Sequence, residues 1–126
     1  VCVPIIILGS IIFYISDLGK PKLNNIKNTA NLIELIPEKT MVSAQEIIVS
    51  KCSMCHAKEP LWENMKNAPK LVNLETSTDI INNIDNIYKQ SVLSYAMPPG
   101  NISFLEENER NMINQLYMSV HNIKNK

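Results

Sequence analysis

Five consecutive residues, Cys52-Ser53-Met54-Cys55-His56, place the strongest constraint on what this chain folds around. Two cysteines separated by two residues and followed directly by a histidine form the C-x-x-C-H spacing at which a c-type haem is attached. Each thiol can add to a haem vinyl group to form a thioether, and the adjacent imidazole can then serve as an axial ligand of the iron. The motif predicts one covalent haem c, anchored by Cys52 and Cys55 and ligated by His56.

Three alternative interpretations fit these residues less well. A structural zinc ion needs four ligands, and outside the motif the chain offers only Cys2 and His121 as further cysteine or histidine ligands. A thioredoxin-like C-x-x-C needs a preceding strand, whereas the flanking pattern is helical. A disulfide between Cys52 and Cys55 would close a small, strained loop and leave His56 unexplained.

Length and charge set the outer limits of function. The chain has 126 residues, which suits one small folded domain, and a large prosthetic group would help so short a chain to build a core. Its 12 basic and 12 acidic side chains give no net charge. We therefore expect no nucleic-acid partner, and any protein partner must be recognised locally.

Residues 1–16 are apolar, with no charged side chain before Asp17. A membrane-spanning helix needs about 20 apolar residues, and the chain starts with Val1 rather than Met. We expect the C-terminal end of a transmembrane helix here, with Cys2 as an apolar filler. A signal peptide is the main alternative, but the segment lacks a basic start and an A-x-A-like cleavage site. A buried soluble helix is the third interpretation.

Residues 17–40 are polar and are predicted to tether this membrane segment to a haem domain over residues 41–126. Within the tether, Leu32, Ile33, Leu35 and Ile36 favour a short helical turn or a patch resting on the domain, and Pro37 limits any helix. A tether of this length would let the domain stand off the membrane or swing toward a partner.

Three helices are predicted in the haem domain. The first starts at a capping box, Ser43 to Glu46, with a Val42–Ile47 hydrophobic staple, and delivers Cys52. The others span about 79–95 and 106–120, where apolar residues recur at helical spacing. Because no run alternates like a strand, we expect an all-α domain.

A sixth iron ligand is required for a pure electron carrier, and a methionine thioether raises the potential of a histidine-ligated haem. Of the six methionines, Met97 is favoured because Pro98 and Pro99 stiffen the loop directly after it. His121 is the weaker alternative. Pro69, or with less support Pro60, is predicted to place its carbonyl against the far ring nitrogen of His56; a purely loop-shaping role for each proline stays open.

These residues resemble class I c-type cytochromes, and more closely the C-terminal cytochrome domain of bacterial membrane-bound urate hydroxylases. The resemblance covers about residues 43–120. It is carried by C-S-M-C-H-A at 52–57, Pro60, Trp62, A-P-K at 68–70, I-Y-K-Q at 87–90, M-P-P-G-N at 97–101 and E-R at 109–110. Where that family tends to place a hydroxyl cap before its last helix, this chain has Glu106, a poor N-cap. We therefore expect the start of that helix to shift.

The resemblance implies a small class I cytochrome c-like fold on the periplasmic side of the bacterial inner membrane. It also implies an upstream membrane domain that oxidises urate, and a respiratory acceptor such as a terminal oxidase or a soluble cytochrome. The lysines of residues 17–40 would alone favour a cytoplasmic side, but covalent haem attachment in this family takes place outside. The alternative function is a free-standing, membrane-anchored mono-haem cytochrome that shuttles electrons between respiratory complexes. Under either function the chain has no catalytic residue of its own, and any enzymatic activity belongs to the parent protein.

Overall fold

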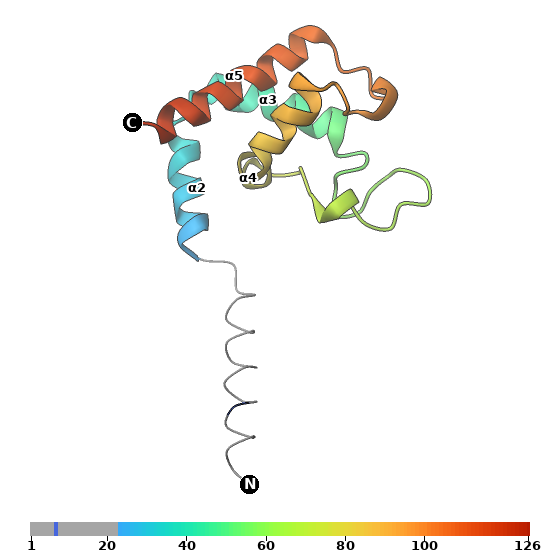
Figure 1. The fold of residues 1–126 in the computed structure, drawn as a ribbon, viewed down its shortest axis with the longest axis horizontal. Helices are drawn as coiled ribbons and strands as arrows, with labels where there is room; N and C mark the ends of the chain where they lie inside the picture. Colours follow the sequence, from blue (N-terminus) through green and yellow to red (C-terminus); the bar gives the residue numbers. More distant parts are fainter. Residues whose placement is uncertain (1–6, 8–22) are drawn as a thin grey trace.

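The computed structural model of the chain describes residue 7 and residues 23–126, which form helices joined by loops (Figure 1). No strand occurs among the described residues, so the all-α prediction is confirmed for them. The elements are α2 (Leu23–Leu35), α3 (Glu38–Cys52), the 3-10 turn η1 (Pro69–Leu71), α4 (Ser77–Ile87), the π-helical segment η2 (Tyr88–Leu93), the 3-10 turn η3 (Pro99–Asn101) and α5 (Glu107–Lys124).

The predicted membrane segment, residues 1–16, lies outside the described residues except for Ile7. Within residues 23–126, no helix has both the length and the apolar character that crossing a membrane requires.

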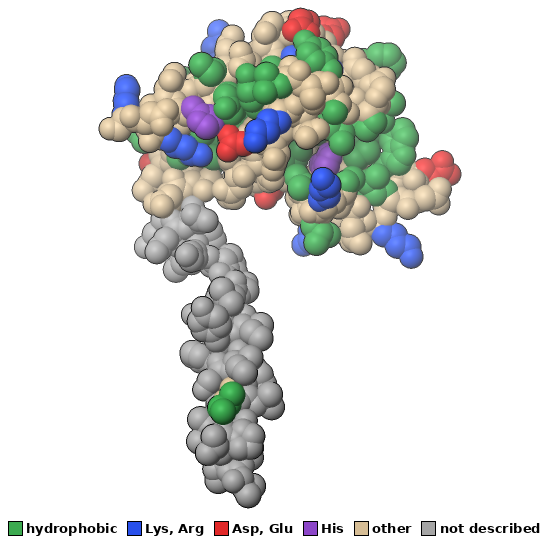
Figure 2. Space-filling model, in the orientation of Figure 1, with side chains coloured by type: hydrophobic (Ala, Val, Ile, Leu, Met, Phe, Trp, Pro, Cys, Tyr) green, Lys and Arg blue, Asp and Glu red, His purple; other side chains and the backbone are tan. Residues whose placement is uncertain are grey.

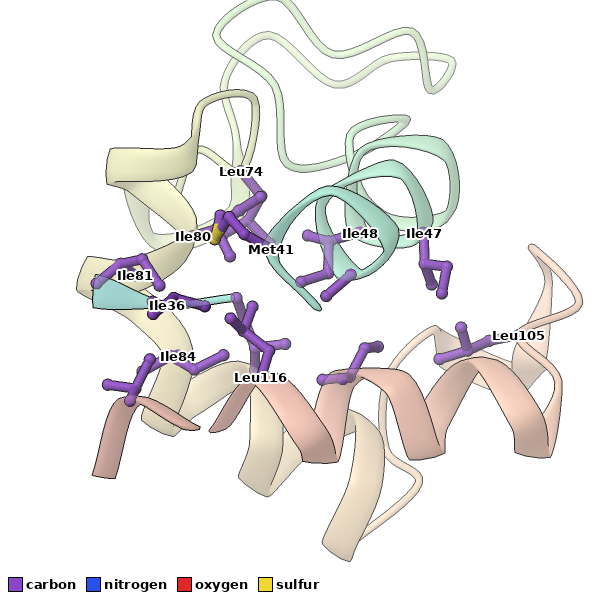
Figure 3. Packing of buried hydrophobic residues seen from close by; sticks show 14 residues of the cluster. Ile36, Met41, Ile47, Ile48, Leu74, Ile80, Ile81, Ile84, Leu105 and Leu116 are labelled. Carbon is purple, nitrogen blue, oxygen red and sulfur yellow. The ribbon is translucent and has the colours of Figure 1, made fainter. Parts of the chain in front are cut away.

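The hydrophobic core lies between α3, α4 and α5 (Figure 3). Helix α5 packs along α3 and also contacts α4 and η2. The side chains with the least exposure come from all three helices: Ala44, Ile48, Ile80, Ile113, Leu116 and Val120. On α5 the buried positions Ile113, Leu116 and Val120 recur at the spacing of one helical face.

Helix α3 begins five residues before the predicted start, and the predicted capping box is wrong. Pro37 precedes the first residue of the helix, and its carbonyl accepts the N–H of Met41 at 3.1 Å. Met41 is buried, so the apolar face of α3 continues past Ser43 toward Pro37. Val42 is 47% exposed and therefore makes no staple with Ile47.

The helix predicted at 79–95 is confirmed, but it starts at Ser77 and ends in the π-helical segment. A true capping box precedes it: the Asp79 N–H donates to Thr76 Oγ1, and the Thr76 N–H donates to Asp79 Oδ2, both at 3.1 Å. The T-x-x-D pattern at 76–79 was the missed sequence signal.

The last predicted helix is confirmed as α5, and it extends to Lys124. The expected shift of its start does not occur, because Glu106 occupies the N-cap position and α5 begins at Glu107. The Glu109 carboxylate reaches back to accept the Glu106 N–H at 2.8 Å, which satisfies a backbone donor at this end.

The predicted tether is shorter than expected, because part of it belongs to the folded domain. Residues 23–35 form α2, which packs against α4 and α5. Thr29 is buried and its hydroxyl donates to Asn82 Oδ1 at 3.0 Å. Ile36 is 4% exposed within the core and Leu32 and Ile33 pack against it, so these apolar residues rest on the domain, whereas Leu35 is 65% exposed.

We predict that Leu116→Ala lowers the free energy of unfolding by about 2–5 kcal/mol, because the substitution leaves a cavity in the core. The matched control is Met118→Ala on the same helix, where the side chain is 50% exposed; it should cost within about 0.5 kcal/mol. Urea denaturation followed by circular dichroism measures both. Equal costs for the two variants would contradict the packing described here.

Candidate haem site

One cavity brings together all five residues predicted from the sequence to hold the cofactor. Cys52, Cys55, His56, Pro69 and Met97 line a space of about 370 Å³. Three come from the end of α3 and the turn after it, one from η1, and Met97 from the loop between η2 and η3. The fold therefore places Met97 beside a motif from which more than 40 residues separate it.

The rest of the cavity wall suits a large apolar group with a polar edge. The apolar side chains in the wall are Met54, Met65, Val72, Leu74, Ile87 and Ile102. Polar lining residues that are exposed, and so stand at the rim, include Lys70, Asn86 and Gln90. An apolar interior with a few polar groups is the usual composition of a cofactor pocket.

The C-x-x-C-H motif is held in a turn that continues the hydrogen bonding of α3. The Cys52 carbonyl accepts the N–H of Cys55 at 3.2 Å and the N–H of His56 at 2.8 Å. Residues four apart in such a turn lie on one face, so Cys52 and His56 point to the same side. This turn explains why the Cys52 thiol and the His56 imidazole line the same cavity.

The imidazole of His56 is fixed by a hydrogen bond to Val72. Ring atom Nδ1 lies 2.9 Å from the Val72 carbonyl oxygen, and the His56 carbonyl accepts the Leu74 N–H at 2.7 Å. Because a carbonyl can only accept, Nδ1 is the donor, and in a neutral imidazole Nε2 then keeps a free lone pair. A metal ion on the cavity side would find that lone pair available.

The predicted bond from His56 to the Pro69 or Pro60 carbonyl is wrong. The carbonyl of Pro69 instead accepts the Val72 N–H at 3.1 Å, closing the turn η1. Pro69 thus lines the cavity and shapes the turn that brings the Val72 carbonyl to the ring. The sequence signal for Val72 was weak, since any residue provides a carbonyl.

Cys52 has the properties of a thiol that is shielded from water. Burial, and secondarily the neighbouring Cys55, raises the pKa of Cys52 from 9.0 to about 11. Cys52 and Cys55 are both free thiols. Redox-active C-x-x-C sites depend on a lowered thiol pKa, so this environment is opposite to what a thioredoxin-like function requires.

The zinc and bis-histidine alternatives gain no support. Among residues 23–126, no three His, Cys, Asp or Glu side chains gather closely enough to hold a metal ion. His121 lies in the last turn of α5, where its Nε2 is 2.8 Å from Asp85 Oδ1, and it does not line the cavity. The hydrogen bond with His121 lowers the pKa of Asp85.

The M-P-P-G-N string builds the loop that carries Met97. The Met97 N–H donates to the Gln90 carbonyl at 2.9 Å, and Pro98 is buried. Gly100 has φ +58°, a left-handed conformation that glycine adopts without steric cost. The Asn101 side chain bridges to Leu105, accepting its N–H at 2.9 Å and donating to its carbonyl at 3.2 Å.

An apolar surface lies on segments that also contribute residues to the cavity wall. Hydrophobic side chains gather on the right of Figure 2, over the loop after α3 and the loop before α5. Exposed large apolar residues in these loops and in η1 include Leu61, Leu71, Ile102 and Phe104. Such a surface is typical of a contact with another protein or a membrane.

Comparison with protein-family models, curated proteins and solved structures found no match to this chain. The case for a function therefore depends on the site itself. The residues fit a c-type haem: two thiols and an imidazole with a free Nε2 share an apolar cavity with a thioether from a separate loop.

We predict that Cys52 in the haem-free protein resists alkylation at pH 8. A rise in pKa from 9.0 to about 11 leaves about 100-fold less thiolate, which is the reactive form. The rate of iodoacetamide modification, resolved by peptide mass spectrometry, should keep rising with pH up to about 11. The same chain in denaturant is the control. A plateau for folded Cys52 near pH 9 would contradict the burial.

Proposed function

We propose that this chain is a mono-haem c-type cytochrome domain that transfers electrons. The observation that carries the proposal is the shared cavity: the C-x-x-C-H motif and Met97 line the same space. Electron transfer needs a bound redox centre with both axial positions filled, and His56 and Met97 are the two side chains suited to fill them.

Each residue would have a defined part in holding the haem. The S–H bonds of Cys52 and Cys55 would add across two vinyl groups, sulfur joining one carbon and hydrogen the other, so attachment consumes no oxidant. His56 would ligate through Nε2, and Met97 would ligate through its sulfur. When bound, the haem supplies reversible one-electron oxidation and reduction.

The surroundings favour an electron carrier over a haem enzyme or a ligand sensor. A methionine at the sixth position raises the potential and blocks access of small ligands. Carrying an electron requires no general acid or base, and among residues 23–126 no carboxylate lines the cavity. The exposed apolar side chains at its mouth would allow a redox partner to approach closely.

The proposed electron donor is the membrane domain of a urate-oxidising enzyme, with this domain as its periplasmic relay. Support comes from the sequence string M-P-P-G-N with a following E-R, behind an apolar segment at residues 1–16. The free-standing membrane-anchored cytochrome is the alternative, and it would use the same haem site with a different donor.

We predict that replacing both Cys52 and Cys55 with Ala abolishes covalent haem. The chain would be expressed with a c-type haem maturation system, denatured and stained for haem on a gel. Ser53→Ala is the matched control, because Ser53 lies inside the motif and its hydroxyl donates only to the Val49 carbonyl; this variant should keep its haem. Haem retention by the double variant would exclude thioether attachment at this motif.

The donor is tested with membranes that carry the full reading frame. On adding urate without oxygen, we expect the absorption bands of a reduced c-type cytochrome. Dithionite is the control for total reducible haem. Reduction by dithionite but not by urate would reject the urate donor and favour the free-standing carrier. Absence of covalent haem from the unmodified chain would reject electron transfer itself.

A further inference from the structure

Arg110 is a buried cation that none of the sequence motifs explains. It lies near the start of α5 and is 4% exposed. Its Nη1 donates to the Ser91 carbonyl and, at 3.3 Å, to the Met97 carbonyl. The guanidinium carbon also stands 4.3 Å from the centroid of the Tyr95 ring.

The partners of Arg110 are unusual for a buried arginine. Within residues 23–126, no carboxylate forms an ion pair with it. Burial of a charge is costly unless hydrogen bonds compensate for lost water. Here the compensation comes from two main-chain carbonyls and an aromatic face, all within the segment 91–97. The buried guanidinium of Arg110 therefore holds the segment 91–97 in place.

The π-helical segment supplies one of these carbonyls. In η2 the Ser94 N–H bonds to the Lys89 carbonyl at 3.0 Å, a wider turn than in an α-helix. The next two carbonyls along the chain then serve the Met97 loop. That of Gln90 accepts the Met97 N–H at 2.9 Å, and that of Ser91 accepts from Arg110.

Both backbone polar groups of Met97 are thus held, the N–H by Gln90 and the carbonyl by Arg110. Removing the guanidinium would leave two carbonyls without this donor and free the loop on one side. A thioether is a neutral, weak ligand, so the entropy lost in presenting it counts strongly toward its binding. A fixed backbone reduces that loss.

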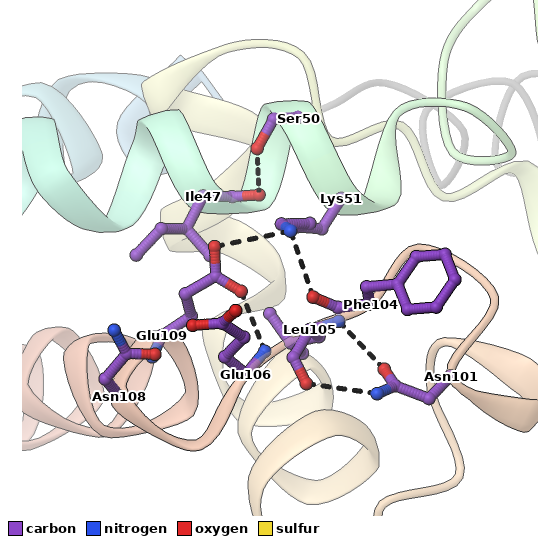
Figure 4. Close-up of polar contacts among 9 residues, drawn as sticks. All are labelled: Ile47, Ser50, Lys51, Asn101, Phe104, Leu105, Glu106, Asn108 and Glu109. Atoms are coloured by element: carbon purple, nitrogen blue, oxygen red, sulfur yellow. Dashed lines mark hydrogen bonds and ion pairs between the residues drawn. The ribbon is translucent and has the colours of Figure 1, made fainter.

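The residue before Arg110 holds the other side of the site (Figure 4). Glu109 Oε1 lies 3.4 Å from Lys51 Nζ, and Lys51 also donates to the Phe104 carbonyl at 3.0 Å. Lys51 directly precedes Cys52. In the first turn of α5, Glu109 is therefore linked to the C-x-x-C-H motif through Lys51, and Arg110 is linked to the loop of Met97.

We propose that Arg110 is the positioning residue that holds Met97 in place as the sixth ligand. The inference rests on the proposed haem function and deepens it. Lysine should not replace it, since its flexible ammonium lacks the planar group that lies over Tyr95 while its Nη1 reaches both carbonyls. The role is distinct from maintenance of the core, because the bonds of Arg110 end on η2 and on the Met97 loop rather than on α3 or α4.

The test compares four haem-loaded variants: Arg110→Lys, Arg110→Met, Met97→Ala and His121→Gln. Three readouts are used: the weak charge-transfer band of methionine-ligated ferric haem, the dissociation constant for imidazole, and the reduction potential. His121→Gln is the control, because it breaks a polar contact of the same helix with α4, away from the cavity.

Both Arg110 variants should keep covalent haem, lose intensity in the charge-transfer band and bind imidazole at least about tenfold more tightly, with a lowered potential. Met97→Ala should show the full effect, and His121→Gln should match the unmodified protein. Arg110→Lys retains the positive charge, so a change in that variant isolates positioning from electrostatics.

Arg110 variants that match the unmodified protein in band and imidazole affinity would overturn this inference and leave the haem function standing. If Arg110→Met does not accumulate, Arg110→Lys alone decides by the same criteria. A Met97→Ala protein with unchanged spectrum would overturn the ligand assignment and the inference together. An unmodified chain without covalent haem would instead reject the proposed function.

Discussion

The hydrogen bond between the His56 ring and the Val72 carbonyl is the contact on which the candidate site depends. It joins the end of α3 to the segment that re-enters the core at Leu74, whose N–H bonds to the His56 carbonyl. Residues 57–68 form an irregular loop that leads into η1, and the whole segment is constrained at both ends. The same bond fixes the histidine tautomer, so it couples the loop geometry to the chemistry of the free Nε2.

Much of the arrangement could be predicted from local sequence signals, and the exceptions have physical causes. Helical periodicity located α4 and α5, and the motif with Met97 located the cavity. The capping signature at Ser43 gave the wrong helix start, because burial of Met41 prolongs α3 toward Pro37. The capping box at Thr76, which starts α4, was missed. The partner of His56 and the role of Arg110 depend on main-chain carbonyls, which leave no mark in the sequence.

The first turn of α5 links the two parts of the cavity wall. Lys51 and Glu109 connect it to the attachment side, and Arg110 connects it to the loop of Met97. The ion pair is partly exposed, and alone it stabilises little. It adds a polar contact between α3 and the start of α5, next to the buried guanidinium that reaches the loop. The rest of α5 supplies packing through Ile113, Leu116 and Val120.

The packing of α2 changes the reach expected of the domain. With α2 placed on α4 and α5, only residues 17–22 separate the apolar segment from the folded unit. Six residues span at most about 20 Å when extended. If residues 1–16 end a transmembrane helix, as proposed, the haem domain is confined close to the membrane surface. An electron donor within the same membrane protein satisfies that confinement directly. A free-standing anchored shuttle would have the same short connection and would reach its partners by diffusion of the whole anchored chain.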